Sequence, residues 1–199
     1  MLQPRSPALC APAGRDAAEA AEAHLVAAVA RGERAAFDAL YRAYHPRLTR
    51  FLDRMLRRPP LVEEVLDDTM LVVWRGAQRY NGTSKVSTWI FAIAYRTALK
   101  ALRRLDEAVE DAADDVHASL EPGPEQRLDE RQVREQLRKA LGALPAPQRA
   151  VVELTYYHGI AYREIAAIVD CPVDTVKTRM FHARRRLKAL LGGWLEGRS

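Results

Sequence analysis

Apolar side chains recur at steps of three and four residues through most of the chain, and no stretch alternates between apolar and polar residues as a half-buried strand would. One apolar stripe runs from about His24 to Met55, a second spans residues 62–74, and a third spans residues 89–98. Such steps place the apolar side chains on one face of an α-helix. We therefore expect residues 24–105 to fold as a helical bundle.

Proline, glycine and capping residues mark where these helices should end or begin. Pro59–Pro60 interrupts the first stripe, because proline lacks the amide hydrogen that a helix interior needs. Asn81–Gly82 is a turn signal, and Ser87 or Thr88 is expected to cap the helix that follows. In the second half of the chain, residues 127–141 and 149–157 show further amphipathic helical patterns.

The last two helical patterns have the spacing of a helix-turn-helix. We predict a short helix over residues 162–169, a tight connection over residues 170–173, and a longer helix with Asp174 as its N-cap. Ala166 is small where two helices cross closely, and Val176 is apolar where the second helix must pack on the first. This motif favours DNA binding through the second helix, and an ordinary hairpin with a solvated basic face is the alternative.

The net charge of +5 is distributed in blocks of opposite sign. The net charges along the chain are −1 over residues 1–24, +8 over 25–105, −8 over 106–125 and +6 over 126–199. Two basic blocks favour a nucleic-acid partner, although a basic protein without one is the alternative. The acidic block ends in Pro and Gly and is typical of a solvated linker.

These shifts in composition set the expected domain boundaries. They are a disordered tail over residues 1–23, a first helical domain over 24–105, a flexible acidic linker over 106–125 and a second helical domain over 126–195.

The sequence offers no pattern for metal, cofactor or catalytic chemistry. Its two cysteines, Cys10 and Cys171, form no CxxC or Cys/His cluster, and we expect free thiols. No P-loop, dinucleotide-binding glycine pattern or Ser/His/Asp constellation occurs, so we expect neither an enzyme nor a cofactor. No run of 18 apolar residues and no signal-peptide pattern occur, which favours a cytoplasmic protein without membrane insertion.

Two strings carry a resemblance to a known family. The first is STWIFAIA at residues 87–94, preceded by DDTM at residues 67–70 and YNGTSKV at residues 80–86. The second is TVKTRMFHARRRL at residues 175–187, preceded by YREIA at residues 162–166. In this order and about ninety residues apart, they resemble the extracytoplasmic-function group of the sigma-70 family.

The resemblance implies an all-α fold of two small domains, a sigma-2-like bundle and a sigma-4-like helix-turn-helix, joined by the flexible acidic linker. It implies an alternative sigma factor without catalytic chemistry, working at the nucleoid with RNA polymerase core. The implied partners are the β′ clamp helices and the β flap of that core, promoter DNA and an anti-sigma factor. The acidic linker would either mimic nucleic acid near the RNA exit path or act as a solubilising spacer.

The resemblance and the side-chain chemistry together name three sets of site residues. For core-polymerase binding they are Asp67, Asp68, Val72 and Trp74. For binding of the −10 element they are Tyr80, Asn81, Lys85, Trp89, Arg96, Lys100 and Arg103. For binding of the −35 element they are Lys177, Thr178, Arg179, Phe181, His182, Arg184 and Arg185. Trp89 has a second interpretation as a packing residue of the core.

Several positions depart from the family's usual pattern. The chain has Asp67–Asp68 where the family often has Gln-Glu, and Met70 where an aromatic residue is common. Arg96, Asp174 and His182 stand where Asn, Gly and Arg are frequent. These positions face DNA or polymerase, so they leave the promoter sequence open. The competing function is a stand-alone dimeric helix-turn-helix regulator, which would leave the first domain without a role.

Overall fold

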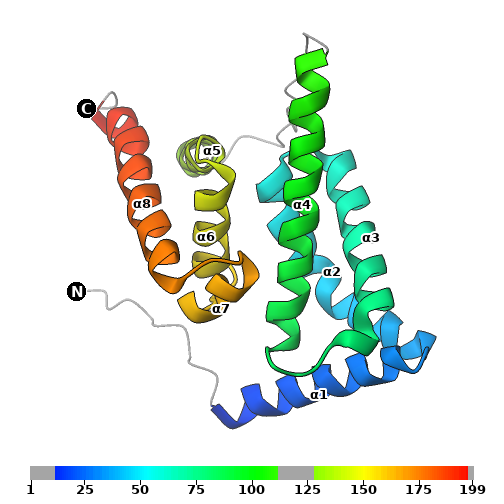
Figure 1. Ribbon diagram of the computed structural model, residues 1–199. Coiled ribbons are helices and arrows are strands. Elements are labelled where there is room, and N and C mark those ends of the chain that lie inside the picture. Colours follow the sequence, from blue (N-terminus) through cyan, green and yellow to red (C-terminus); the bar gives the residue numbers. More distant parts are fainter. Residues whose placement is uncertain (1–11, 112–127, 197–199) are drawn as a thin grey trace.

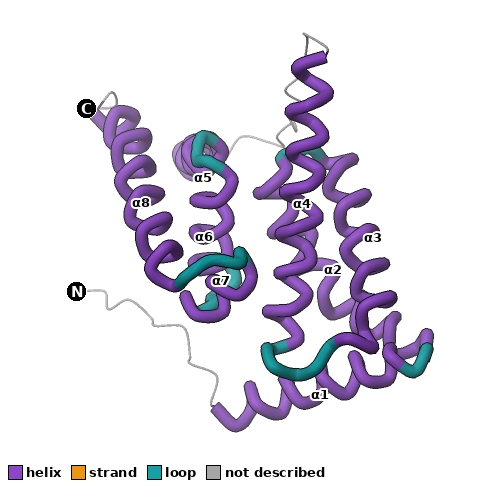
Figure 2. Tube along the Cα trace, in the orientation of Figure 1, coloured by secondary structure: helices purple, strands orange, loops and turns teal. Residues whose placement is uncertain are grey.

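The fold is all-α over the residues that the computed structural model describes, 12–111 and 128–196, with no strand among them (Figure 2). The helices are α1 (Pro12–Ala30), α2 (Arg34–Leu56), α3 (Pro59–Gly76), the short 3-10 helix η1 (Ala77–Arg79), α4 (Val86–Asp111), α5 (Leu128–Gly142), α6 (Ala146–Tyr156), α7 (Tyr162–Ile168) and α8 (Val173–Glu196). The expectation of an all-α fold is confirmed.

Helices α1–α4 form the first bundle. In Figure 1, α2, α3 and α4 run side by side and α1 lies across one end of them. The apolar stripe of α2 is buried along its whole length, from Leu40 to Met55. Pro59 and Pro60 stand in the first turn of α3, where a missing amide hydrogen leaves no hydrogen bond unmade.

Two predicted caps are wrong by two or three residues. The helix α4 begins at Val86, so Ser87 and Thr88 lie inside its first turn, and the Trp89 amide already donates to the Lys85 carbonyl at 3.0 Å. The helix α8 begins at Val173, so Asp174 also lies inside the helix rather than at its cap. In both cases the helical hydrogen-bond pattern begins on the N-terminal side of the polar residue that we expected to cap the helix.

Two expected segment boundaries also differ from the observed ones. Residues 12–23 of the predicted tail are helical, because α1 is Ala-rich and its Glu22 accepts a hydrogen bond from the Tyr44 hydroxyl at 2.6 Å. The helix α4 continues to Asp111, six residues into the predicted acidic linker. The rest of that linker and residues 1–11 lie outside the described residues.

Helices α5–α8 form the second unit, and α7 and α8 make the predicted helix-turn-helix. Val176 is fully buried and Ala166 is 8% exposed, so the two residues meet the packing roles that the sequence assigned to them. Asp170 turns the chain between the helices in a left-handed conformation, with φ of 50°. This part of the sequence prediction is confirmed.

The two helical units pack directly against each other. α7 lies against α4, and α6 lies against α2 (Figure 1). Buried side chains of both units belong to one continuous core. Within the described ranges, no helix is long and apolar enough to cross a bilayer.

Candidate nucleic-acid and polymerase interface

An acidic groove between α2 and α3 is lined by three of the four residues expected to bind polymerase, namely Asp67, Asp68 and Trp74. Asp67 and Asp68 are exposed, while Val65 and Leu66 beside them are buried, so the carboxylates occupy the polar face of α3 as predicted. The groove has a volume of about 820 Å³. Its lining consists of Arg34, Ala35, Phe37, Asp38, Tyr41, Asp67, Asp68, Met70, Leu71 and Trp74.

Aromatic side chains form the floor of this groove. Phe37 meets Trp74 edge-on, with ring centroids 5.1 Å apart. Burial raises the pKa of the Tyr41 hydroxyl, and the carboxylate of Asp67 raises it further. Val72 is 47% exposed next to the groove without lining it. An acidic rim over apolar walls is suited to a partner helix that carries both basic and apolar side chains.

The loop before α4 is held by its own side chains. The Tyr80 hydroxyl donates to the Ser84 carbonyl at 2.5 Å, and the Asn81 side-chain oxygen accepts from the Thr83 amide at 3.1 Å. The ring of Tyr80 lies 5.0 Å from Trp89 at an angle of 39°. Trp89 is partly buried against the core, which matches its interpretation as a packing residue. Asn81 is exposed.

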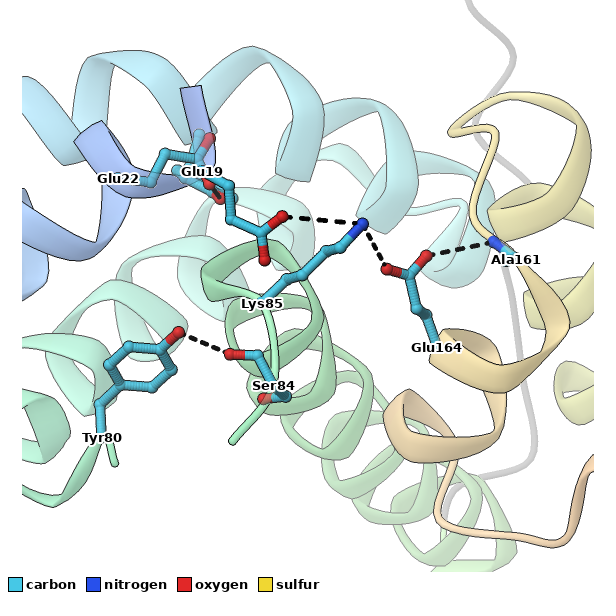
Figure 3. Close-up of polar contacts among 8 residues, drawn as sticks. Glu19, Glu22, Tyr80, Ser84, Lys85, Ala161 and Glu164 are labelled. Atoms are coloured by element: carbon cyan, nitrogen blue, oxygen red, sulfur yellow. Dashed lines mark hydrogen bonds and ion pairs between the residues drawn. The ribbon is translucent and has the colours of Figure 1, made fainter. Parts of the chain in front are cut away.

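Three cations predicted to bind the −10 element lie on one exposed face of α4. Arg96, Lys100 and Arg103 follow each other at steps of four and three residues, and all three are exposed. Lys85, at the start of the helix, differs from them because it is ion-paired with Glu164 of α7 at 2.9 Å. The exposed cations along α4 therefore form a basic stripe. At the N-terminal end of this stripe, Lys85 is already paired with an acidic side chain (Figure 3).

Most of the predicted −35 residues share the outer face of α8. Phe181 is 62% exposed, and Thr178, His182 and Arg185 are exposed beside it. The ring of His182 meets that of Phe181 edge-on at 5.5 Å. Arg185 is four residues after Phe181, so it lies on the same face.

Side chains at the edges of this face have local partners. Lys177 pairs with Asp174 at 2.9 Å. The Arg184 Nε donates to the Tyr156 hydroxyl at 3.1 Å. Tyr156 could not be predicted from the sequence, because its contact with Arg184 depends on α6 and α8 lying side by side.

Arg179 does not join the other −35 residues. It is partly buried, and one of its Nη atoms is buried without a hydrogen-bond partner. Burial raises the pKa of the Tyr95 hydroxyl in α4, and the charge of Arg179 lowers it. Arg179 is therefore less accessible to DNA than the exposed residues of α8.

A set of polar contacts between the two domains was not predicted from the sequence. Arg54 of α2 binds the fully buried Glu153 of α6 at 2.9 Å and lies over the Tyr157 ring. Burial raises the pKa of Glu153, and Arg54 opposes that rise. Arg149 donates to the carbonyl of Met55 at 2.8 Å and to that of Gly142 at 2.9 Å. The only sequence signal was an acidic residue, Glu153, within an otherwise apolar run.

His158 also lies at this contact. Its ring is 4.8 Å from Phe91 and 6.0 Å from Phe51. Burial lowers the pKa of His158 to about 4, and three arginines of α2, at positions 47, 54 and 50, lower it in the same direction. In the described part of the chain, no group of three His, Cys, Asp or Glu side chains is arranged to hold a metal ion.

Comparison with known proteins places both halves in one family. The model for sigma-70 region 2 matches residues 40–108, and that for sigma-70 region 4 matches residues 134–187. The chain is 32% identical over 174 residues to the ECF RNA polymerase sigma factor SigM of Mycobacterium tuberculosis H37Rv, covering 87% of this chain and 86% of SigM. It is 28% identical over 178 residues to the RNA polymerase sigma-H factor of Pseudomonas aeruginosa PAO1, covering 84% and 92% of the two chains.

Solved structures agree with this assignment. The sigma factor RpoE from Bartonella quintana, in complex with the anti-sigma factor NepR, superimposes with a TM-score of 0.66 at 27% identity and covers 78% of this chain and 96% of RpoE. CnrH, solved with the cytosolic domain of CnrY, shares the fold with a TM-score of 0.66 at 23% identity, over 87% of this chain and 98% of CnrH.

The comparisons do not favour a stand-alone regulator, because such a protein would not need a region 2. Sigma factors are transcription initiation factors rather than enzymes. Both sigma-70 regions occur here in order, and one relative is about one-third identical over most of both chains; the chain therefore belongs to the extracytoplasmic-function group of the sigma-70 family, as an alternative RNA polymerase sigma factor.

Proposed function

We propose that this sigma factor divides promoter recognition between its two domains. The first domain binds polymerase core through the acidic groove of α3 and engages the −10 element with α4 and its preceding loop. The second domain docks on the β flap and reads the −35 element with the outer face of α8. The protein acts in the cytoplasm, at the nucleoid, and has no catalytic activity of its own.

One observation carries this proposal: a helix-turn-helix with an exposed outer face and a bundle with an exposed basic stripe occur in a single chain. Thr178, Phe181, His182 and Arg185 combine hydrogen-bonding and apolar groups, which is the mixture that base edges in the major groove require. Arg96, Lys100 and Arg103 offer charge without such a mixture, which suits the phosphate backbone.

Melting of the −10 element needs a group that retains an extruded base. Extrusion costs a few kcal/mol, and stacking on an aromatic ring returns about 1–3 kcal/mol per base. The loop from Tyr80 to Lys85 is braced by internal hydrogen bonds, so it presents a fixed edge to such a base. Trp89 supports this edge by packing against Tyr80.

We further propose that an anti-sigma factor restrains this protein. RpoE of Bartonella quintana was solved in complex with the anti-sigma factor NepR. A sigma factor without restraint would compete for polymerase core at all times. The acidic groove between α2 and α3 has apolar walls. We expect both an anti-sigma segment and the β′ clamp helices to bind there.

Run-off transcription tests the proposed function. Core polymerase and the purified chain are incubated with genomic DNA fragments, and the start sites of the transcripts are mapped. We expect transcripts with a shared −35 and −10 sequence that require both components. Transcription by core that is unaffected by the chain would contradict the proposal.

A further inference from the structure

A tyrosine outside the helix-turn-helix lies against the edge of the proposed DNA-reading face. Tyr156 is the last residue of α6, and α6 packs alongside α8 (Figure 1). The Nε of Arg184 in α8 donates to the hydroxyl of Tyr156 at 3.1 Å, and the guanidinium lies 5.8 Å from the centre of the tyrosine ring. The two side chains therefore form one unit that is built from two helices.

Tyr156 is more exposed than a packing role requires. It is 59% exposed, whereas Tyr44 is completely buried in the first bundle. A tyrosine that fills a core buries its ring, because the ring supplies most of the apolar area that such a residue removes from water. Arg184, which Tyr156 contacts, follows the exposed Phe181 by three residues, so the pair lies beside the side chains that we expect to meet bases.

The position of Arg184 along α8 favours a phosphate as its ligand. Recognition helices bring their N-terminal residues to the base edges. Arg184 is eleven residues after Val173, the first residue of α8, which corresponds to about 16 Å along the axis at about 1.5 Å per residue. The major groove is roughly 12 Å wide, so a helix that enters it with its N-terminal turn has reached the phosphate backbone at this distance.

The hydrogen bond between Tyr156 and Arg184 leaves donors available on both side chains. Tyr156 uses the Nε–H of Arg184, which leaves the N–H groups of both Nη atoms. A phenol hydroxyl can accept and donate at once, so Tyr156 can accept from Arg184 and still donate its own proton. Among the described residues, neither side chain has a further hydrogen-bond partner. The two Nη atoms of a guanidinium can bind two oxygens of one phosphate side by side.

We propose that Tyr156 is a further DNA contact of this sigma factor and binds the same backbone phosphate as Arg184. In this contact the Tyr156 hydroxyl accepts from the Nε of Arg184 and donates to a phosphate oxygen, while the Nη atoms of Arg184 donate to the same phosphate. The inference rests on the proposed function, because it takes α8 as the helix that enters the major groove. It extends the DNA-binding surface to the end of α6.

Tyr156 also limits the freedom of the arginine before DNA binds. An exposed arginine without a partner samples many rotamers, and ordering it on a phosphate costs side-chain entropy. The hydrogen bond to Nε already restricts the Arg184 side chain, so part of this cost is met in the free protein. Loss of the hydroxyl should therefore weaken DNA binding although no charge is removed.

Tyr156→Phe isolates the hydroxyl, because phenylalanine keeps the ring and removes only the oxygen. Tyr157→Phe is the matched control, since the neighbouring tyrosine is 46% exposed, undergoes the same chemical change and keeps its ring against Arg54. Arg184→Ala and the double variant Tyr156→Phe/Arg184→Ala complete a double-mutant cycle. The cycle measures how far the two side chains act on DNA together.

The probe is a short DNA duplex of mixed sequence, since a phosphate contact carries no sequence information. Fluorescence anisotropy with the full chain should show an affinity that is reduced roughly threefold to tenfold in Tyr156→Phe and unchanged in Tyr157→Phe. Between roughly 50 and 200 mM salt, Tyr156→Phe should keep the wild-type slope because no charge is lost, whereas Arg184→Ala should reduce the slope by roughly one. In the Arg184→Ala background, Tyr156→Phe should have no further effect.

Two results would overturn the proposal. One is an equal affinity of Tyr156→Phe and Tyr157→Phe for the duplex. The other is a loss of the same size from Tyr156→Phe whether or not Arg184 is present, which is what a purely structural role of the hydroxyl would give.

Run-off transcription with wild-type chain and core polymerase tests the proposed function separately. If the wild-type chain directs promoter-specific transcription while Tyr156→Phe and Tyr157→Phe bind the duplex equally, only the Tyr156 contact is overturned. If the wild-type chain directs no transcription while Tyr156→Phe still weakens duplex binding through Arg184, the contact stands and the proposed function is overturned.

Discussion

His158 is the residue whose protonation bears most directly on the contact between the two helical units. Its ring sits between Phe51 and Phe91, and Arg47, Arg50 and Arg54 all disfavour its charged form. The pKa is lowered from 6.5 to about 4, first by burial. Because the pKa is lower in the folded chain than in the unfolded chain, the contribution of His158 to stability is fully present above pH 6.5. This contribution is lost as the pH falls from 6.5 toward 4.

We expect the chain to lose about 1 kcal/mol of stability between pH 7 and pH 5 through His158, a value reduced for solvent screening because the ring is only partly buried. Urea unfolding at the two pH values measures this loss. His158→Gln should remove that part of the pH dependence, whereas His45→Gln, at an exposed position of α2, should leave it in place. An unchanged pH dependence in His158→Gln would contradict the assignment.

Replacing His182 by alanine should affect promoter binding differently from replacing Arg184 by alanine. His182 lies on the outer face of α8, so His182→Ala should cost on the order of 1–3 kcal/mol at one −35 position and relax the preference there. Arg184 lies at the edge of that face against Tyr156, so Arg184→Ala should weaken all promoters about equally and reduce the salt slope by roughly one.

Transcription from a library of −35 sequences checks both expectations. If His182→Ala lowers transcription equally from all −35 sequences and only Arg184→Ala alters the preferred bases, then Arg184 contacts the bases and His182 contributes affinity without base preference. If neither variant changes −35 dependence, α8 is not the reading helix.

Among the helices, α3 is the element whose exposed face we assign to polymerase. Replacing both Asp67 and Asp68 by lysine should weaken binding to core on the order of tenfold or more, because like charges then face each other. Circular dichroism should stay helical, since neither side chain is buried. Glu64 is exposed on the same helix but outside the groove, so the Glu64→Lys variant should bind core with normal affinity. Unchanged affinity in the double variant would remove the two aspartates from the interface.

Helix ends were the part of each element that the sequence predicted least well. The polar residues Ser87 and Asp174 are common caps, yet Val86 and Val173 begin their helices. A cap contributes about 1 kcal/mol, so packing of the adjacent apolar residues decides the boundary when the two disagree. α1 starts before the predicted first helix because its Ala-rich sequence favours a helix and its Glu22 accepts a hydrogen bond from Tyr44 of α2.

At the scale of the whole molecule, the two proposed DNA-binding surfaces lie on different helices, α4 and α8, and we expect polymerase core to fix their spacing. We expect the free chain to bind duplex promoter DNA weakly and to gain affinity in the presence of core polymerase, as an effective-concentration effect predicts. A gel-shift titration with and without core measures this. Nanomolar, sequence-specific binding by the free chain at physiological salt would instead indicate a stand-alone regulator.

The sequence by itself determined the class of fold, the arrangement of a helical bundle followed by a helix-turn-helix, and the exposure of most candidate site residues. Apolar spacing depends on a few neighbours along one helix, so the stripes of α2 and the Ala166–Val176 pair could be predicted from local pattern. The faces of Arg96, Lys100 and Arg103 follow from the same periodicity.

Only the tertiary structure decided which charges meet across the two domains. Lys85 and Glu164, like Arg54 and Glu153, are far apart in sequence, and nothing near either residue indicates its partner. Arg179 is a further case: the resemblance and its chemistry assigned it to DNA, whereas in the structure it is partly buried and one of its Nη atoms is enclosed. The local sequence pattern determines the face of a helix on which a side chain lies. Which other segment packs against that face depends on contacts between residues that are distant in the sequence.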